Sequence, residues 1–154
     1  RNNLKIPFIA AGGITDGYGI YSALSMGADA VQIGTRFAAT IESSANEIYK
    51  QKIVEAGETG TTLIFRKIGL IRTLKNNFSE IIKKAEDNGA SVEELKELLG
   101  TKKEFASIFS DDFNNGLPEA GQGVGNIKEI ISVKMLINKF VEQYIAAKNR
   151  MDNF

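Results

Sequence analysis

Two glycine-containing breaks, Gly12-Gly13 and Gly34-Thr35, are the residues best suited to chemistry, and each directly follows a short strand-like run. Glycine lets the backbone approach a ligand closely, and free backbone N–H groups favour an anion. Thr35 adds a hydroxyl group that can donate a hydrogen bond. The two breaks together predict a phosphate cradle. The alternative is that these glycines only make tight turns between strands and helices.

The chain contains no Cys and no His. The chain therefore cannot form a disulfide, a thiolate or imidazole metal site, a Cys nucleophile, a His general base or a Ser-His-Asp triad by itself. We expect no metal. Nineteen basic side chains balance nineteen acidic ones, so we expect neither nucleic acid nor a membrane as a partner. The chain has no signal-like start, and no apolar run approaches the ~18 residues of a membrane span, so the expected location is the cytoplasm.

A strand–helix–strand unit must position the glycine breaks. Residues 6–11 form a continuous apolar run, which is typical of a parallel strand buried on both faces, and residues 30–33 predict a second strand. Between them, Thr15 or Asp16 can cap a helix that ends at Gly27. The two breaks then lie at adjacent strand ends, which is where (β/α)8 barrels hold phosphate after their seventh and eighth strands.

Beyond this unit the pattern is mixed. A helix capped by Ser43 or Ser44 should end at Gly57. Short strands are expected over residues 61–66 and 70–74. Three polar helices are expected after them: one over residues 78–87, one that begins at the capping box 91–94, and one over residues 102–109. The last apolar stripe predicts an amphipathic helix that must lie against apolar surface; its members are Val133, Leu136, Ile137, Phe140, Val141, Tyr144 and Ile145.

Residues 6–14 and 27–37 resemble the flavin-phosphate region of FMN-dependent barrels, including inosine monophosphate dehydrogenases, hydroxy-acid oxidases and dihydroorotate dehydrogenases. Later motifs narrow the resemblance to the nitronate monooxygenase family (formerly 2-nitropropane dioxygenases) and its relative, the flavin enoyl-acyl-carrier-protein reductase of type II. These motifs are Thr35-Arg36-Phe37, Glu42-Ser43, Tyr49-Lys50, Arg72-Thr73-Leu74-Lys75-Asn76 and Ala120-Gly121-Gln122. The resemblance is weakest over residues 87–115.

The resemblance implies an α/β fold: the C-terminal part of an FMN-binding (β/α)8 TIM barrel plus a mostly helical α+β cap. Residues 1–42 would hold the last two barrel strands, residues 43–117 the cap or substrate domain, and residues 118–154 a loop and helix returning to the barrel. Family members are longer, so we expect a C-terminal fragment. The catalytic His would lie in the N-terminal half, which leaves no catalytic residue in this chain.

The resemblance also implies FMN as the cofactor. Gln32 would point toward the flavin, and Gln122 would come near the active site. Residues 121–125 lack the spacing and the preceding strand of a dinucleotide fingerprint. The FMN phosphate would be held by backbone groups at the two strand ends, namely Ala11, Gly12, Gly13, Gly34 and Thr35.

The implied function is an FMN-dependent oxidoreductase that oxidises alkyl nitronates with O2. An alternative is an enoyl-acyl-carrier-protein reductase that uses NAD(P)H to reduce an enoyl thioester. Nothing in the residues separates the two decisively, although residues 117–125 favour the monooxygenase. A third hypothesis is a non-catalytic phosphate-binding half-barrel that needs its N-terminal half, and a fourth makes residues 43–154 a mostly helical interaction domain.

One departure from the family concerns Asn46, which replaces a His shortly before Tyr49-Lys50. It is either a silent surface change or a change in nucleotide or phosphate contacts. Two parallel strands cannot close a barrel, so exposed edges and apolar faces should make the isolated chain self-associate.

Three charged residues near the glycine breaks have separate expectations. Asp16 should cap a helix rather than act as an acid catalyst, and Asp29 should lie in the turn before the second strand. Arg36 directly follows the predicted phosphate turn. It should either form an ion pair at the barrel rim or reach a substrate anion.

Overall fold

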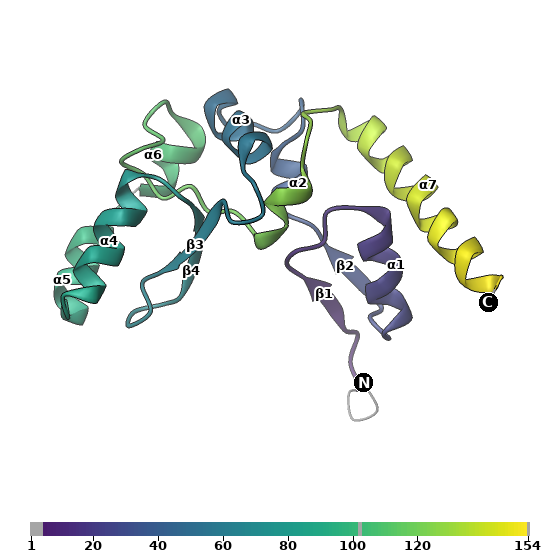
Figure 1. Ribbon diagram of the computed structural model, residues 1–154, viewed down its shortest axis with the longest axis horizontal. Helices are drawn as coiled ribbons and strands as arrows, with labels where there is room; N and C mark the ends of the chain where they lie inside the picture. The colour runs from purple at the N-terminus through teal and green to yellow at the C-terminus, as the bar shows by residue number, and fades with distance from the viewer. Residues whose placement is uncertain (1–4, 102, 154) are drawn as a thin grey trace.

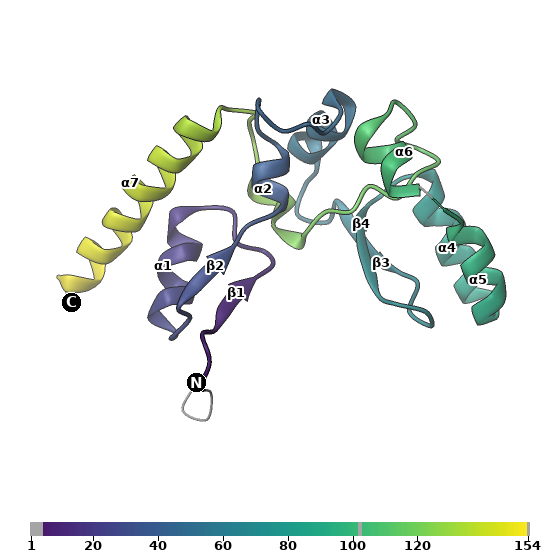
Figure 2. The ribbon, with the colours of Figure 1, turned by 180° about the vertical axis from the view of Figure 1, so that it is seen from behind.

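The computed structural model describes residues 5–101 and 103–153. Figures 1 and 2 show a strand–helix–strand unit with the C-terminal helix on one side of it and a hairpin with most of the other helices on the other. The described residues contain no helix that is both long enough and apolar enough to cross a membrane.

The central unit consists of β1 (Ile9–Ala11), α1 (Gly17–Ser25) and β2 (Ala30–Gln32). The two strands pair in parallel, so their carboxyl ends lie at the same edge of the sheet. Asp16 is the N-cap of α1, because its side chain accepts a hydrogen bond from the Gly19 N–H at 2.7 Å. Gly27 follows the helix with a φ of 100°. The predicted unit and the capping role of Asp16 are therefore confirmed.

The strands of this unit are exposed, whereas the sequence predicted burial on both faces. Ile9 is 56% exposed and Phe8 is 44% exposed. The sheet has only two strands among the described residues, so no neighbouring strand or second layer covers these side chains. The prediction of burial is wrong for this chain, and the expectation of exposed apolar faces is confirmed.

The rest of the chain alternates short helices with one hairpin. In chain order the elements are α2 (Thr35–Ala38), α3 (Glu47–Glu55), β3 (Thr61–Ile64), β4 (Ile71–Leu74), α4 (Asn77–Asp87), α5 (Val92–Leu99), α6 (Lys103–Phe109), the 3-10 helix η1 (Gln122–Asn126) and α7 (Val133–Asp152). Strands β3 and β4 pair antiparallel. Lys102, in the predicted helix over 102–109, lies outside the described residues.

The sequence missed three local features. Helix α3 is capped by Asn46, whose side-chain oxygen accepts a hydrogen bond from the Ile48 N–H, and not by Ser43 or Ser44. The short helices α2 and η1 were not predicted. The capping box at Ser91 and the glycine stop at Gly89 were predicted correctly, because both depend on residues close in sequence.

Three apolar cores connect these elements. One lies wholly within the predicted cap and joins the hairpin to α4 and α5 through residues such as Ile64 and Leu95. A second packs α7 against the central unit. The third, around Tyr49 and Val124, joins α2, α3, β4 and η1.

Helix α7 lies beside α1, as both views of the ribbon show (Figures 1 and 2). Leu136 and Phe140 are buried there, and the Phe140 ring meets that of Phe37 edge-on. Ile137, Val141 and Ile145 remain exposed. The predicted apolar stripe therefore packs along only part of its width.

Candidate functional site

The carboxyl ends of β1 and β2 meet at a pocket of about 220 Å³, called here the strand-end pocket. All six residues predicted to bind the cofactor line it. The full lining is Ala11, Gly12, Gly13, Ile14, Thr15, Gln32, Gly34, Thr35, Gly121 and Gly123. The parallel pairing of β1 with β2 brings the two predicted breaks together, although they lie on different loops.

Three glycines leave room in this pocket. Gly12 and Gly13 have positive φ angles of 90° and 74°, a conformation that other residues rarely adopt. A Cβ atom on Gly12, Gly13 or Gly34 would have nothing within 4 Å, so each would project into open space. The backbone N–H groups of Gly13 and Gly34 form no hydrogen bond with another described residue. They are therefore free to donate to an anion.

Gly121 and Gly123 supply a third wall. The Gly121 N–H donates a hydrogen bond to Thr35 Oγ1 at 2.9 Å. A Cβ on Gly123 would come within 2.6 Å of Thr15 Cγ2 and 2.9 Å of the Gly13 carbonyl oxygen, so this turn packs directly against the Gly13–Thr15 segment. Because Thr35 accepts from Gly121, its hydroxyl hydrogen remains available to donate into the pocket.

Gln122, which the resemblance places near the active site, does not line the strand-end pocket, although two of its neighbours do. Gln122 is exposed at the start of η1, while its neighbours Gly121 and Gly123 line the pocket. The signal was present in the alternating glycines of residues 121–125, which are needed for close packing. A role for Gln122 near an active site stays a prediction.

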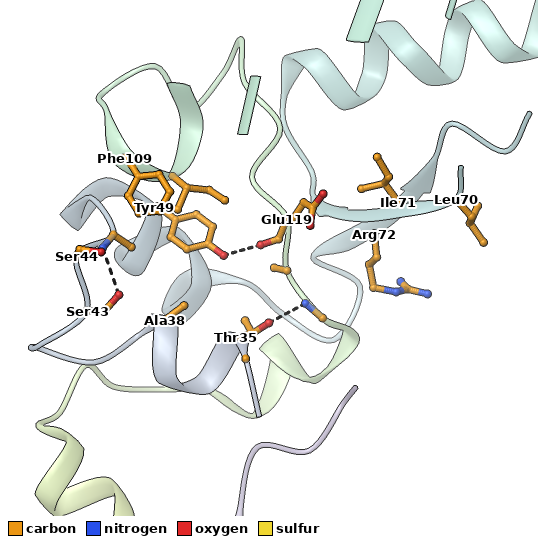
Figure 3. A pocket seen from close by; sticks show the side chains of 15 residues that line it. Thr35, Ala38, Ser43, Ser44, Tyr49, Leu70, Ile71, Arg72, Phe109 and Glu119 are labelled. Carbon is orange, nitrogen blue, oxygen red and sulfur yellow. Dashed lines mark hydrogen bonds between the residues drawn. The ribbon is translucent and has the colours of Figure 1, made fainter. Parts of the chain in front are cut away.

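A second, larger pocket of about 680 Å³ adjoins the first and shares Gly34, Thr35 and Gly121 with it. It is called here the cap pocket (Figure 3). Its remaining lining residues are Ala38, Ser43, Ser44, Ala45, Tyr49, Leu70, Ile71, Arg72, Ile108, Phe109, Glu119 and Ala120. In Figure 3, Tyr49 and Phe109 lie at one end of this pocket, and Leu70 and Arg72 at the other.

Tyr49 links α3 to the segment that carries Gly121. Its hydroxyl donates a 2.5 Å hydrogen bond to the Glu119 carbonyl oxygen, and the residue is only 3% exposed. Burial, and secondarily the charge of Glu119, raise the pKa of Tyr49 to about 12. Tyr49 therefore stays protonated at neutral pH and serves as a hydrogen-bond donor rather than as a proton acceptor.

Strand β4 holds the same segment from the other side. The Leu74 N–H donates to the Pro118 carbonyl oxygen at 2.9 Å, and the Ala120 N–H donates to the Arg72 carbonyl oxygen at 3.2 Å. The hairpin thus determines where Gly121 meets Thr35. Strand β4 is thereby connected to the strand-end pocket through the segment that carries Gly121.

Arg72 is the cation of the cap pocket. Its Nη1 donates to Thr61 Oγ1 at 3.0 Å, and it forms no ion pair with a carboxylate in the described part of the chain. A half-buried guanidinium without an ion-paired carboxylate can bind an anionic group, although the acidic residue Glu119 also lines this pocket.

Arg36 lines neither of these pockets. It is 5% exposed, and its Nη1 donates to the Ala39 carbonyl oxygen at 3.1 Å. Burial lowers the pKa of Arg36 below its ordinary value, and Glu129 opposes this effect. No described carboxylate lies within ion-pair distance, so the expected direct ion pair is absent from the described residues.

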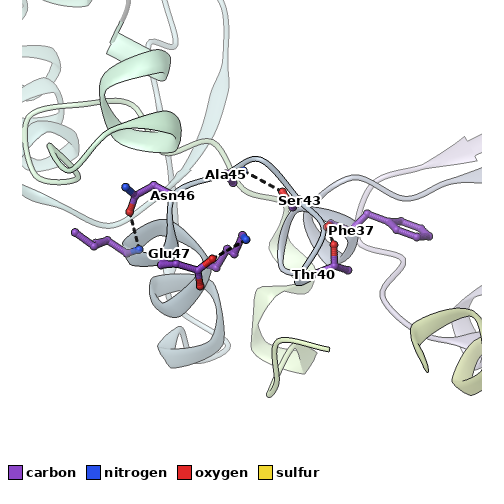
Figure 4. Close-up of polar contacts among 8 residues, drawn as sticks. Phe37, Thr40, Ser43, Ala45, Asn46 and Glu47 are labelled. Carbon is purple, nitrogen blue, oxygen red and sulfur yellow. Dashed lines mark hydrogen bonds and ion pairs between the residues drawn. The ribbon is translucent and has the colours of Figure 1, made fainter. Parts of the chain in front are cut away.

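Asn46 makes structural contacts (Figure 4). Besides capping α3, its side-chain Nδ2 donates to Asp111 Oδ1 at 2.7 Å, and it lines neither pocket. Asn46 is therefore more than a silent surface residue, and in this structure its side chain does not reach the proposed phosphate site. Asp29 lies just before β2, where its carboxylate accepts a hydrogen bond from the Phe8 N–H at 2.8 Å, in agreement with its predicted place in the turn.

Comparison with known protein families gives one match over most of the chain. A model of the family described as nitronate monooxygenase matches residues 1–143. A "Probable nitronate monooxygenase" from Bacillus subtilis is 36% identical over 143 residues, which cover 92% of this chain and 41% of that protein. Another from Staphylococcus haemolyticus is 40% identical over 88 residues, 56% of this chain and 25% of that protein. The chain therefore spans less than half the length of these relatives.

Solved structures agree with this match. FabK from Thermotoga maritima superposes with a TM-score of 0.91 at 33% identity, over 99% of this chain and 48% of that protein. Nitroalkane oxidase from Streptomyces ansochromogenes superposes with a TM-score of 0.76 at 26% identity, over 98% of this chain and 43% of that protein. The α/β fold of this chain is similar to that of both enzymes.

Proposed function

The chain belongs to the nitronate monooxygenase family, and we propose that it is the phosphate-binding portion of an FMN-dependent oxidoreductase that oxidises alkyl nitronates with O2. The observation that carries this proposal is the strand-end pocket. Backbone donors from two loops and the Thr35 hydroxyl line one small space, which suits a dianionic phosphate.

The residues present fit the phosphate group of FMN. Gly13 and Gly34 offer free N–H groups, and the lack of side chains at these positions leaves room for the phosphate oxygens. Thr35 would donate its hydroxyl hydrogen while Gly121 holds the oxygen in place. Ala11, Gly12 and Gln32 also line this pocket. Gln32 would point toward the flavin. When bound, FMN supplies the ability to accept electrons or a hydride, while the protein supplies orientation and charge placement.

We propose that β1 and β2, in residues 1–42, are the last two strands of a (β/α)8 barrel. Residues 43–117 would form the cap, and residues 118–154 would return to the barrel. The separate core of the cap and the packing of α7 on the central unit support this division. The cap pocket, which adjoins the phosphate site, would hold the substrate, with Arg72 near an anionic group.

A second candidate is an enoyl-acyl-carrier-protein reductase that transfers a hydride from NAD(P)H through FMN to an enoyl thioester. If FabK is such a reductase, the superposition of this chain favours this candidate, because its TM-score is 0.91 with FabK and 0.76 with nitroalkane oxidase. A third candidate is a phosphate-binding half that has no activity until its N-terminal half is present. Its support is that the chain spans 41% of its Bacillus relative.

Binding and chemistry are tested separately. Titration of the chain with FMN, followed by flavin fluorescence, should give near one FMN per chain, and Gly34→Val should abolish binding because its side chain projects into the strand-end pocket. Gly69→Val is the matched control, since Gly69 also faces open space but lies in the β3–β4 turn. Equal loss in both variants, or no binding by the unaltered chain, would contradict the FMN site.

The chemistry needs the protein expressed from its complete reading frame. Oxygen uptake with propionate 3-nitronate would support the monooxygenase, whereas NADH oxidation dependent on a crotonyl thioester would support the reductase. Binding of inorganic phosphate but not of FMN by the chain itself would favour the third candidate.

A further inference from the structure

Arg36 is a buried charge that the proposed flavin site does not use. Its guanidinium donates one hydrogen bond, to the Ala39 carbonyl oxygen, and the residue is 5% exposed. No carboxylate of the described residues lies within 4.0 Å of it. Burial of a charge is costly unless the charge is compensated, so this guanidinium is suited to an anion from outside the chain.

The space beside Arg36 is a separate hollow of about 260 Å³, called here the Arg36 hollow. It shares only Thr15 with the strand-end pocket. It lies among the start of α1, helix α2, the segment after η1 and helix α7. Its lining residues are Thr15, Asp16, Arg36, Asn126, Lys128, Glu129, Leu136, Lys139, Phe140 and Gln143.

The two acids of the hollow, Asp16 and Glu129, each have a partner other than Arg36. Asp16 accepts a hydrogen bond from the Gly19 N–H at 2.7 Å and so caps α1. Glu129 pairs with Lys139. Glu129 still acts on Arg36 at longer range and partly offsets the effect of its burial, but neither acid lies within ion-pair distance of the Arg36 guanidinium.

The remaining groups favour a negative ligand. Lys128 forms no ion pair or hydrogen bond with another described residue, so it adds a second cation that is not ion-paired. Gln143 uses its Oε1 to accept from the Gly17 N–H, which leaves its side-chain NH2 group able to donate into the hollow.

We propose that the Arg36 hollow is a second binding site, which takes a small oxyanion, either a phosphate or a carboxylate group. The planar guanidinium matches both through paired N–H donors. Gln143 and Lys128 would complete the contacts. This site is distinct from the proposed FMN phosphate site, so neither depends on the other.

The test is a titration of the isotope-labelled chain by NMR, with inorganic phosphate in one arm, acetate in another and chloride as the control for ionic strength. We expect saturable shifts of the Arg36 Nε–H and the Gln143 side-chain NH2 signals with phosphate or acetate. The Gly13 amide reports the strand-end pocket separately. Shifts at Arg36 and Gln143 that do not saturate, or that chloride reproduces, would overturn the proposal and indicate an adventitious ion only.

Three variants should change the anion affinity in predicted directions. Arg36→Lys keeps the charge but loses the paired donors, so affinity should fall by at least about tenfold. Lys128→Gln should weaken binding and Glu129→Gln should strengthen it, each by about threefold, because both side chains are exposed and their charges are partly screened. Unchanged affinity in Arg36→Lys, or equal effects of the two exposed variants, would contradict the site. The two exposed variants keep the test informative if Arg36→Lys does not fold.

Discussion

The N–H of Gly121 lies 2.9 Å from Thr35 Oγ1, although 86 positions separate the two residues. This hydrogen bond joins the start of α2 to the segment that is hydrogen-bonded to strand β4. Thr35 lines both the strand-end pocket and the cap pocket. If the segment that carries Gly121 moves, we therefore expect Thr35 and the proposed phosphate site to move with it, because this hydrogen bond connects them.

Thr35→Val should weaken FMN binding by about tenfold, because the pocket loses a hydroxyl donor and Gly121 loses its acceptor. Thr35→Ser keeps the hydroxyl and should bind within about twofold of the unaltered chain. Flavin fluorescence titration measures both affinities. Equal affinities for the Val and Ser variants would show that the hydroxyl has no part in binding.

Gly17→Ala should separate helices α1 and α7. An added Cβ would lie 2.2 Å from the Phe140 carbonyl oxygen and 2.7 Å from the Tyr144 backbone nitrogen, and neither helix backbone can yield without losing contacts. The free energy of unfolding should fall by about 1–3 kcal/mol. Urea unfolding measures it, with Gly57→Ala as the control because a Cβ there meets nothing within 4 Å. A loss no larger than that of the control would contradict the close helix contact.

Tyr49 should make stability fall at high pH. Its pKa is raised from an ordinary value of 10.0 to about 12, so the folded state favours the protonated phenol. This contribution is complete below about pH 10 and is lost as the pH rises toward about 12.

The measurement is the free energy of unfolding from pH 8 upward for the unaltered chain and for Tyr49→Phe. The Phe variant should be less stable by about 1 kcal/mol at pH 8, and the difference should shrink above pH 10. The exposed Tyr18→Phe is the control and should show no such convergence. A pH-independent difference for Tyr49→Phe would mean that the hydroxyl is not the titrating group.

Self-association should depend on the exposed face of β1. Ile9→Lys should raise the concentration at which the chain dimerises, because it places a charge on the uncovered sheet. Ile81→Lys is the control, since Ile81 is similarly exposed, at 52% against 56% for Ile9, but lies on α4 in the cap. Sedimentation equilibrium measures the change. A monomeric unaltered chain, or equal effects of both variants, would contradict this prediction.

Local signals in the sequence were sufficient for much of the fold. The cap at Asp16, the stop at Gly27 and the capping box at Ser91 act within one helical turn, so the residues that cause them are visible in sequence. The glycine breaks after β1 and β2 were also identifiable. Their convergence followed from the expected parallel pairing of the strands.

The remaining features required the tertiary structure. Asn46 caps α3 in place of Ser43, and its amide also contacts Asp111, 65 positions away. Gly121 rather than Gln122 lines the pocket because β4 and Tyr49 fix that segment from outside. No local pattern contains these contacts.

The adjacent residues Thr35 and Arg36 show what the sequence determined and what only the tertiary structure decided. The sequence identified both as candidates for binding an anion and placed them at one turn. Successive side chains on a helix point about 100° apart, so within α2 Thr35 lies on the strand-end pocket and Arg36 on a different hollow beside α7. The residue types could be read directly, whereas the surroundings of each side chain depended on helices that pack from distant parts of the chain.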